Sequence, residues 1–207
     1  MTRFRTCVSS LCGLGLALAL PSAAAEPDCH DPTEKSVASR ASPLIPGEFE
    51  LVDVDTGLAA TKRTYEGYVR VVFFGFTHCT TVCPIGLANL GRTLDELGED
   101  RTDVRALFIT TDPERDSAET MAAYISVFAE DIVGLRGTDE QLGAASRAFR
   151  TEAVKVDIAS DQVYQMDHPA IFYLMDRQGD FVRTLSSSGD PKELAAQIRA
   201  VLNPPVL

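Results

Sequence analysis

The chain has 207 residues, of which 45% are hydrophobic and 24% are charged, and this composition is typical of a globular protein with one sizeable core. Its formal net charge is −11 at pH 7. Because phosphate backbones are bound by basic surfaces, this acidity argues against a nucleic-acid-binding protein. It predicts a well-solvated surface and, as a weaker alternative, partners that present basic patches.

The first 25 residues have the pattern of a secretory signal peptide. Arg3 and Arg5 give a positive start, residues 8–20 are apolar, and small residues at 22–25 provide a cleavage site. The apolar run is shorter than the roughly 20 residues that cross a bilayer as a helix, so an uncleaved membrane anchor is the weaker alternative. We therefore expect export to the periplasm, with anchoring at the inner membrane as the alternative.

Cleavage after Ala25 would change both the charge and the cysteine count. It removes two basic residues and no acidic one, so the remaining chain carries 17 − 30 = −13. Two of the five cysteines leave with the signal peptide, and Cys29, Cys79 and Cys83 remain. Three thiols in an exported protein do not make a small disulfide-rich scaffold.

Residues 26–46 contain four prolines and several serines without an apolar period, which predicts a flexible arm. The domain itself is expected over residues 47–207. In chain order the pattern predicts a hairpin over 49–62 that turns at 55–57, a strand at 69–76, a helix from Pro84 to residue 97, a strand at 104–110, a helix at 117–130, a short strand at 132–135, a helix at 138–149, a hairpin of strands 170–176 and 181–185, and a helix at 191–202.

Strands alternate with helices along this order, and an antiparallel pair completes the sheet. The order predicts an α/β, thioredoxin-like three-layer fold with a mixed central sheet and an N-terminal hairpin extension. Two thiols at the end of an early central strand, where a helix begins, have the placement found in thioredoxin-like proteins.

The stretch FFGFTHCTTVCPIG carries these thiols, Cys79 and Cys83, in a C-x-x-x-C spacing. Pro84 fits the first helical position, so we expect Cys83 at or near the N-cap and Cys79 in the preceding loop. The positive end of the helix dipole stabilises a thiolate and lowers the thiol pKa there. Both sulfurs are therefore expected to be reactive or ready to bind a metal.

The thiol pair has three interpretations: a structural disulfide, a redox couple or part of a metal site. A structural disulfide fits an exported protein, but it is not usually placed at a strand–helix junction. A metal site needs further ligands, and the chain has three histidines. His30 lies in the arm and His78 is expected to point away from its neighbour Cys79, whereas His168 precedes a strand that could place it over the thiols.

Cys79, Cys83 and His168 are thus the leading candidate ligands. Two thiolates and one imidazole suit Cu(I) at low coordination number and Cu(II) with an added ligand. Structural zinc prefers four protein ligands, and Met166 is expected to pack in the core rather than bind a metal. Catalytic zinc with three ligands stays open.

Three motifs in this order, FGFTHCTTVCP, TTDPERDSAETMAAY and MDHPAIFYLMD, resemble those of the SCO/SenC family of thioredoxin-fold copper proteins. The resemblance runs from about residue 46 to residue 202. It implies that copper, as Cu(I) and Cu(II), is bound by Cys79, Cys83 and His168. It also implies a metallochaperone that delivers copper to the CuA site of cytochrome c oxidase, reduces the cysteines of that site, or does both. The implied partner is the CuA-containing oxidase subunit or another copper chaperone.

Two positions depart from the family pattern. Residues 80–82 read Thr-Thr-Val where the family usually has Pro-Asp-Val, which changes the stiffness and the charge of the loop. Pro169 follows His168 where the family usually has a small hydroxyl residue, and a cis peptide bond at this proline is an open question. Neither departure removes a ligand.

The acidic residues 112–116 are interpreted mainly as a turn and helix start, where acids suit the helix dipole, and a role beside the metal loop or in docking is the minor alternative. Asp167 is expected to face away from His168, because adjacent side chains in extended chain point in opposite directions.

A rival function, a thiol:disulfide oxidoreductase or a thiol peroxidase, needs only Cys79 and Cys83. A third alternative is a redox or copper sensor that uses the same pair and signals to a membrane partner. We expect a carrier rather than an enzyme, with thiol:disulfide reductase activity as the open point.

Overall fold

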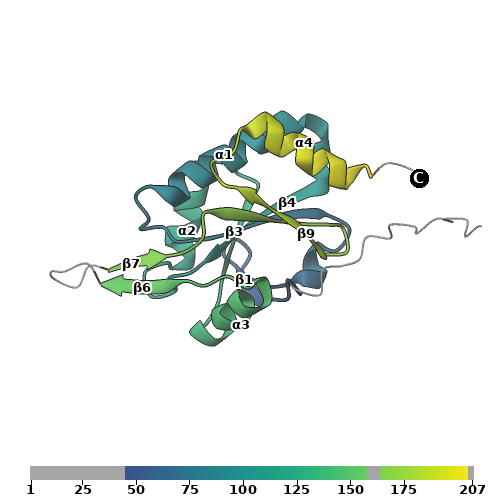
Figure 1. Ribbon diagram of the computed structural model, residues 1–207. Coiled ribbons are helices and arrows are strands. Elements are labelled where there is room, and N and C mark those ends of the chain that lie inside the picture. The colour runs from purple at the N-terminus through teal and green to yellow at the C-terminus, as the bar shows by residue number, and fades with distance from the viewer. Residues whose placement is uncertain (1–44, 158–163, 205–207) are drawn as a thin grey trace, which may run out of the picture. The chain divides into compact units, whose positions relative to one another are not determined.

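The computed structural model describes residues 45–157 and 164–204, and the predicted signal peptide and nearly all of the predicted arm lie outside this range. A seven-stranded mixed sheet in the order β2-β1-β5-β4-β3-β8-β9 forms its centre (Figure 1). The strands are β1 (Glu50–Asp53), β2 (Ala59–Thr61), β3 (Val69–Gly75), β4 (Val104–Thr110), β5 (Ile132–Arg136), β8 (Ile171–Met175) and β9 (Phe181–Ser186).

The inner strand β3 is buried along its whole length, as its largely apolar run predicts, and this includes its one charged residue, Arg70. It pairs in parallel with β4 and antiparallel with β8. The predicted hairpin of β1 and β2 is also confirmed, and Asp53 Oδ1 accepts hydrogen bonds from the backbone of Asp55 and Thr56 in its turn. This hairpin extends the sheet, because β1 also pairs antiparallel with β5.

Helices cover both faces of the sheet, which gives the three predicted layers. The buried side chains of α1 (Val82–Leu97), α2 (Ala118–Ile125) and α4 (Pro191–Leu202) pack in one core on one face, and those of α3 (Asp139–Phe149) pack in a second core on the other. Figure 1 shows α1 and α4 on the side of the sheet opposite α3. Two short 3-10 helices, η1 (Lys62–Tyr65) and η2 (Gly98–Asp103), precede β3 and β4.

Three helices, α2, α3 and α4, begin at their predicted caps. Ser117, Thr138 and Asp190 each accept a backbone hydrogen bond from the first turn of the helix that follows. Within the described residues, none of the helices combines the length and apolar character that spanning a bilayer requires.

The end of α2 differs from the prediction, which continued this helix to residue 130. The helix ends at Ile125, and a tight turn follows in which the backbone N–H of Phe128 donates to Ile125 O over 2.9 Å. This turn packs the Phe128 ring against the Tyr124 ring, with ring centroids 5.3 Å apart. It also places the backbone carbonyl of Phe128 against Gly91 of α1. Tertiary packing thus ends the helix before its apolar pattern does.

The predicted hairpin of β8 and β9 is confirmed, whereas a third hairpin was not predicted. β6 (Val154–Asp157) and β7 (Tyr164–Asp167) pair antiparallel in a sheet of their own, apart from the seven-stranded sheet. β6 reads Val-Lys-Val-Asp, a four-residue alternation at the lower limit of a strand signal, and all four of its residues are exposed. The hairpin lies immediately before His168, in a part of the chain where the sequence predicted no regular element.

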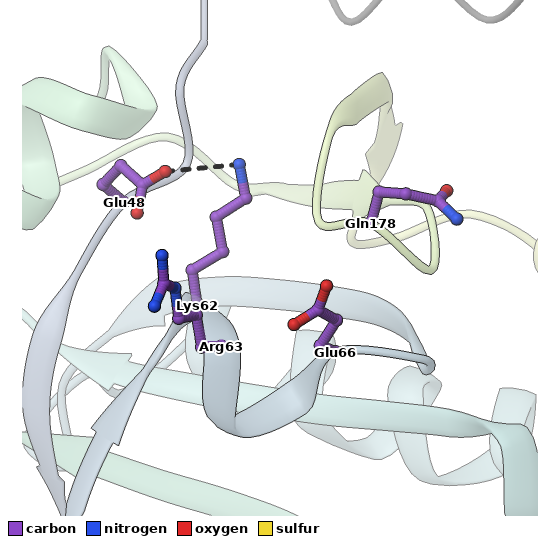
Figure 2. A pocket seen from close by; sticks show the side chains of 5 residues that line it. All are labelled: Glu48, Lys62, Arg63, Glu66 and Gln178. Carbon is purple, nitrogen blue, oxygen red and sulfur yellow. Dashed lines mark ion pairs between the residues drawn. The ribbon is translucent and has the colours of Figure 1, made fainter.

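A polar pocket of about 250 Å³ lies at the amino end of β3 (Figure 2). It is lined by Glu48, Lys62, Arg63, Glu66 and Gln178. Lys62 Nζ lies 3.3 Å from a carboxylate oxygen of Glu48 and 3.3 Å from one of Asp180, so the ammonium group in this pocket is already paired with carboxylates of the protein. The thiols lie beyond the carboxyl end of β3, so this pocket is separate from them.

Candidate metal centre

Both thiols lie where β3 passes into α1. Cys79 is half-buried in the connecting loop, Cys83 is buried in the first turn of α1, and both are free. The backbone N–H of Cys83 donates to Cys79 Sγ over 3.4 Å, so the helix start points a donor at the loop sulfur. α1 begins at Val82, two residues before the predicted start at Pro84, which places Cys83 inside the helix rather than at its cap.

Gly75 at the end of β3 allows Cys83 to approach the strand closely. A Cβ atom at this position would lie 2.7 Å from Cys83 Sγ and 2.7 Å from Cε2 of Phe108. Since neither a helix-borne sulfur nor a buried ring can move away cheaply, only glycine fits between them.

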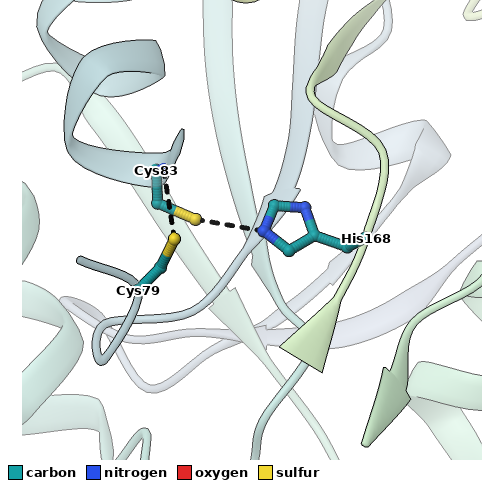
Figure 3. Close-up of side chains that lie close together, drawn as sticks. All are labelled: Cys79, Cys83 and His168. Atoms are coloured by element: carbon teal, nitrogen blue, oxygen red, sulfur yellow. Dashed lines mark hydrogen bonds between the residues drawn. The ribbon is translucent and has the colours of Figure 1, made fainter. Parts of the chain in front are cut away.

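His168 reaches the thiols from the far side, where the chain leaves β7 (Figure 3). Its Nε2 lies 3.3 Å from Cys83 Sγ. Its Nδ1 lies 3.3 Å from the carbonyl oxygen of Pro169, and because a carbonyl only accepts, Nδ1 carries the proton of the neutral ring. Nε2 therefore presents its lone pair to the sulfur.

Aromatic rings hold this imidazole from one side. The rings of Phe73 and Phe76 meet the His168 ring edge-on, with centroid distances of 6.2 Å and 5.8 Å. These contacts fix the plane of the imidazole, so that Nε2 points into the same space as the two sulfurs.

One ligand atom from each of Cys79, Cys83 and His168 lies within 4.8 Å of the other two. Among the residues that the structure describes, this is the only group of three or more His, Cys, Asp or Glu side chains close enough to hold a metal ion. The structure thus brings together all three residues predicted as ligands, while their role as ligands stays a prediction.

The other candidates fall where the sequence placed them. His78 is exposed and its Nδ1 bonds the hydroxyl of its neighbour Thr77, outside the group of three. Met166 packs against the core. Asp167 is exposed, and the Nδ1 of His168 bonds the Pro169 carbonyl rather than this carboxylate.

The predicted lowering of both thiol pKa values was wrong for Cys83. Burial raises the pKa of the Cys83 thiol far above its ordinary value, and the charges of Cys79 and Asp116 raise it further. Burial also lowers the pKa of His168, against the smaller opposite effects of the Pro169 carbonyl and Asp167. The metal-free site therefore holds a neutral Cys83 thiol beside a neutral imidazole.

The interpretation of residues 112–116 as a simple turn was also incomplete. Asp116 is fully buried, and its carboxyl group accepts hydrogen bonds from Thr77 Oγ1 and Thr110 Oγ1, each over 2.6 Å, and from the Thr77 backbone N–H over 3.2 Å. It ties the start of the thiol loop, residues 77–81, to the end of β4. The helix cap is Ser117 instead.

Asp112 is buried as well and contacts the hairpin. It forms an ion pair with Arg115 and accepts a 2.7 Å hydrogen bond from the hydroxyl of Tyr164 in β7. Sequence reasoning did not find Thr77, Arg115 or Tyr164 as neighbours of the site, because their contacts join residues far apart in the chain and no local pattern reports them.

Comparison with known proteins finds relatives in the SCO1/SenC family. The sequence model of the SCO1/SenC family matches residues 37–203. The human mitochondrial protein SCO1 homolog is 36% identical over 164 residues, which cover 78% of this chain and 54% of the human protein. The chain thus spans about half the length of this relative.

Solved structures agree with the sequence comparison. ScoI of Bradyrhizobium japonicum with copper bound is 39% identical, with a TM-score of 0.71 over 76% of this chain and 99% of that one. Yeast Sco1 with copper bound is 33% identical, with a TM-score of 0.72 over 79% of this chain and 91% of that one. The thioredoxin-like fold predicted from the sequence is confirmed. With a family match that covers most of its length, the chain belongs to the SCO1/SenC family.

Proposed function

We propose that this protein is a copper metallochaperone that carries copper on Cys79, Cys83 and His168 and serves the assembly of the CuA site of cytochrome c oxidase. One observation carries the proposal: three ligand atoms lie within 4.8 Å of one another in a member of a family whose relatives ScoI and Sco1 were solved with copper bound. Copper is here the cargo of the protein.

The donor set fits copper better than zinc. Two thiolates bind Cu(I), and the imidazole provides the third ligand that Cu(II) needs before an added one completes its site. Structural zinc takes four protein ligands, and within the described residues no fourth His, Cys, Asp or Glu side chain joins the group.

The difference in burial between the two thiols supports transfer by ligand exchange. Cys79 is half-buried, so an incoming thiolate of an acceptor can approach a bound metal ion beside this residue. Cys83 is fully buried, so it would be the last thiolate to be displaced. A site with two thiolates and Cu(I) has a net charge of −1, which favours acceptors with basic neighbours. The CuA-containing oxidase subunit, or another copper chaperone, is the proposed partner.

Reduction of the acceptor's cysteines is a second candidate function, favoured by the contact of the Cys83 backbone N–H with Cys79 Sγ. In that reaction the two thiols pass two electrons and two protons to an acceptor disulfide, which becomes a dithiol, while Cys79 and Cys83 form a disulfide. Cys79 is the attacking thiol, because Cys83 is buried and its pKa is raised.

We propose the periplasm as the place of action. Residues 1–25 support this as a signal peptide, with an uncleaved membrane anchor as the alternative, and they lie outside the described residues. Blotting the periplasmic and membrane fractions of cells that express the full chain tests this point, and a chain found in the cytoplasm alone would contradict it.

Copper binding is expected to release the proton of Cys83. Because burial raises the pKa of this thiol, it is protonated at neutral pH and must lose its proton to bind as a thiolate. The apparent affinity therefore rises with pH, by about tenfold per pH unit for this one proton. His168 has a lowered pKa, so protonation of its ring competes only below the ordinary value of 6.5.

This release is measured with a pH indicator while the weakly buffered, reduced protein is saturated with Cu(I) between pH 6.5 and pH 8. The Cys83→Ser variant serves as the control and should release one proton fewer at saturation. An affinity that does not change with pH would contradict the buried, protonated thiol.

The function itself is tested by anaerobic titration of the reduced protein with Cu(I) and with Cu(II). We expect one copper per chain and a thiolate-to-Cu(II) absorption band that is lost in Cys83→Ser. An absence of tight binding, together with reversible oxidation of the two thiols, would replace the carrier by the thiol:disulfide oxidoreductase.

A further inference from the structure

His168 follows a hairpin that the main sheet does not hold. Within the described residues β6 and β7 pair only with each other, and every β6 side chain is exposed. A two-stranded hairpin is marginally stable by itself, so side-chain contacts must fix where this one lies. The position of the imidazole relative to α1 therefore depends on residues outside the group of three.

Met166 packs the hairpin against the core, and Tyr164 makes the polar and cation–π contacts that join it to residues 112–116. Tyr164 is the only buried residue of β7, with 9% of its surface exposed. Its hydroxyl donates its proton to Asp112 Oδ1 over 2.7 Å and lies 3.1 Å from Glu114 Oε2. Arg115 Cζ lies 3.7 Å and Lys155 Nζ 3.8 Å from the centre of its ring, within the range of cation–π attraction.

Arg115 connects this tyrosine to the wall behind His168. Its Nη1 donates to the Tyr164 carbonyl over 3.1 Å, and its Nε pairs with the buried Asp112. Its Cζ lies 5.6 Å from the centre of the Phe76 ring, and Phe76 meets the His168 ring edge-on. One guanidinium thus touches the backbone of β7 and an aromatic ring against which the imidazole packs.

The segment of residues 112–116, which contains Arg115, also contacts the thiol loop. Asp116 binds Thr77 at the start of the thiol loop, while Asp112 and Arg115 bind Tyr164 in the hairpin. Residues 112–116 therefore set the thiol loop and the hairpin relative to one another.

We propose that Arg115 and Tyr164 are positioning residues for His168, which hold its Nε2 within reach of Cys83 Sγ. Neither residue touches the proposed metal position, and they act on it only through the hairpin and Phe76. The consequence for copper rests on the proposed function, whereas the position of the imidazole does not.

The test compares Arg115→Met with the wild-type protein in two measurements. In the metal-free protein, NMR cross-peaks between the rings of His168 and Phe76 should weaken or disappear. In Cu(II) titrations the affinity should fall by about 10- to 100-fold, as for other residues that orient a metal-binding histidine. Because Arg115 acts through His168, its replacement in a His168→Ala background should cost no further affinity.

Arg105→Met is the matched control. Arg105 Cζ lies 3.6 Å from the Tyr68 ring centre at the amino end of β4, so this variant loses the same kind of contact far from the thiols. It should leave both the ring cross-peaks and the Cu(II) affinity unchanged. If Arg115→Met does not fold, Tyr164→Phe, which removes only the hydroxyl, takes its place in the same measurements, with a smaller loss expected.

Unchanged cross-peaks in the replacement variant would overturn the proposal, and so would an equal loss of affinity with and without His168. If the wild-type protein binds no copper, the proposed function fails, and the ring cross-peaks alone then decide whether Arg115 positions His168.

Discussion

Replacing His168 by alanine is expected to lower the Cu(II) affinity by more than about 100-fold, which is more than about 2.7 kcal/mol of binding free energy. Loss of a residue that only orients a ligand costs about 10- to 100-fold, and a direct ligand costs more. The affinity for Cu(I) should fall much less, because Cys79 and Cys83 still provide two thiolates. Competition titrations with a chelator, for each oxidation state in turn, measure both affinities.

His78→Ala is the matched control, because this histidine adjoins Cys79 in the sequence but bonds Thr77 and stays half exposed. Its Cu(II) affinity and its nitrogen hyperfine couplings in the electron paramagnetic resonance spectrum should equal those of the wild-type protein. If His168→Ala keeps the wild-type spectrum, or if His78→Ala loses it, the third ligand has been assigned wrongly.

Periodicity and caps were sufficient to predict the strands of the main sheet and the starts of α2, α3 and α4, whereas α1 begins two residues before its predicted start. β3 and β4 are largely apolar runs, each with one arginine at its second position, and such runs have few alternatives to a buried strand. The N-caps Ser117, Thr138 and Asp190 act within three residues of their own position, so the chain itself contains the signal. The three proposed ligands were found because cysteine and histidine are rare and chemically distinctive in this chain.

The surroundings of those ligands could not be predicted in the same way. Each strand of the β6–β7 hairpin has only four residues, and the alternation Val-Lys-Val-Asp in β6 belongs to exposed residues, so the strand signal is weak, although Tyr164 in β7 is buried. The acids at 112–116 fit a helix start equally well until Asp112 and Asp116 are seen to be buried against Tyr164 and Thr77. Thr77 and Asp116 are 39 positions apart, and Asp112 and Tyr164 are 52 positions apart, so no local sequence pattern indicates that they form hydrogen bonds.

The pKa of Cys83 shows which of two effects dominates. The first turn of a helix stabilises a thiolate, and the expectation of a lowered pKa rests on this effect alone. Burial in the core opposes it, and the depth of burial depends on Gly75 and Phe108, which the sequence does not place beside this sulfur. The helix dipole therefore predicts the direction of a thiol pKa shift only where the thiol stays near the solvent.

Replacing Asp116 by alanine is expected to destabilise the fold by about 4 kcal/mol and to lower Tm by about 8 to 16 °C. The change leaves the backbone N–H of Thr77 and the hydroxyls of Thr77 and Thr110 without their buried acceptor, and each such loss costs about 1 to 3 kcal/mol. Thermal unfolding followed by circular dichroism measures the effect in the metal-free protein.

Thr77→Val removes one of the three hydrogen bonds that the Asp116 carboxyl group accepts. This variant keeps the shape of the side chain and the backbone N–H and loses only the hydroxyl that donates over 2.6 Å, so it should cost about 1 kcal/mol. If Asp116→Ala lowers Tm no more than Thr77→Val does, the carboxyl group is not the common anchor of β4 and the thiol loop. Asp116→Ala should be the more destabilising variant because it leaves three buried donors without their acceptor, whereas Thr77→Val leaves none unpaired. Moving one of the three donors to a new partner would still leave the other two without one.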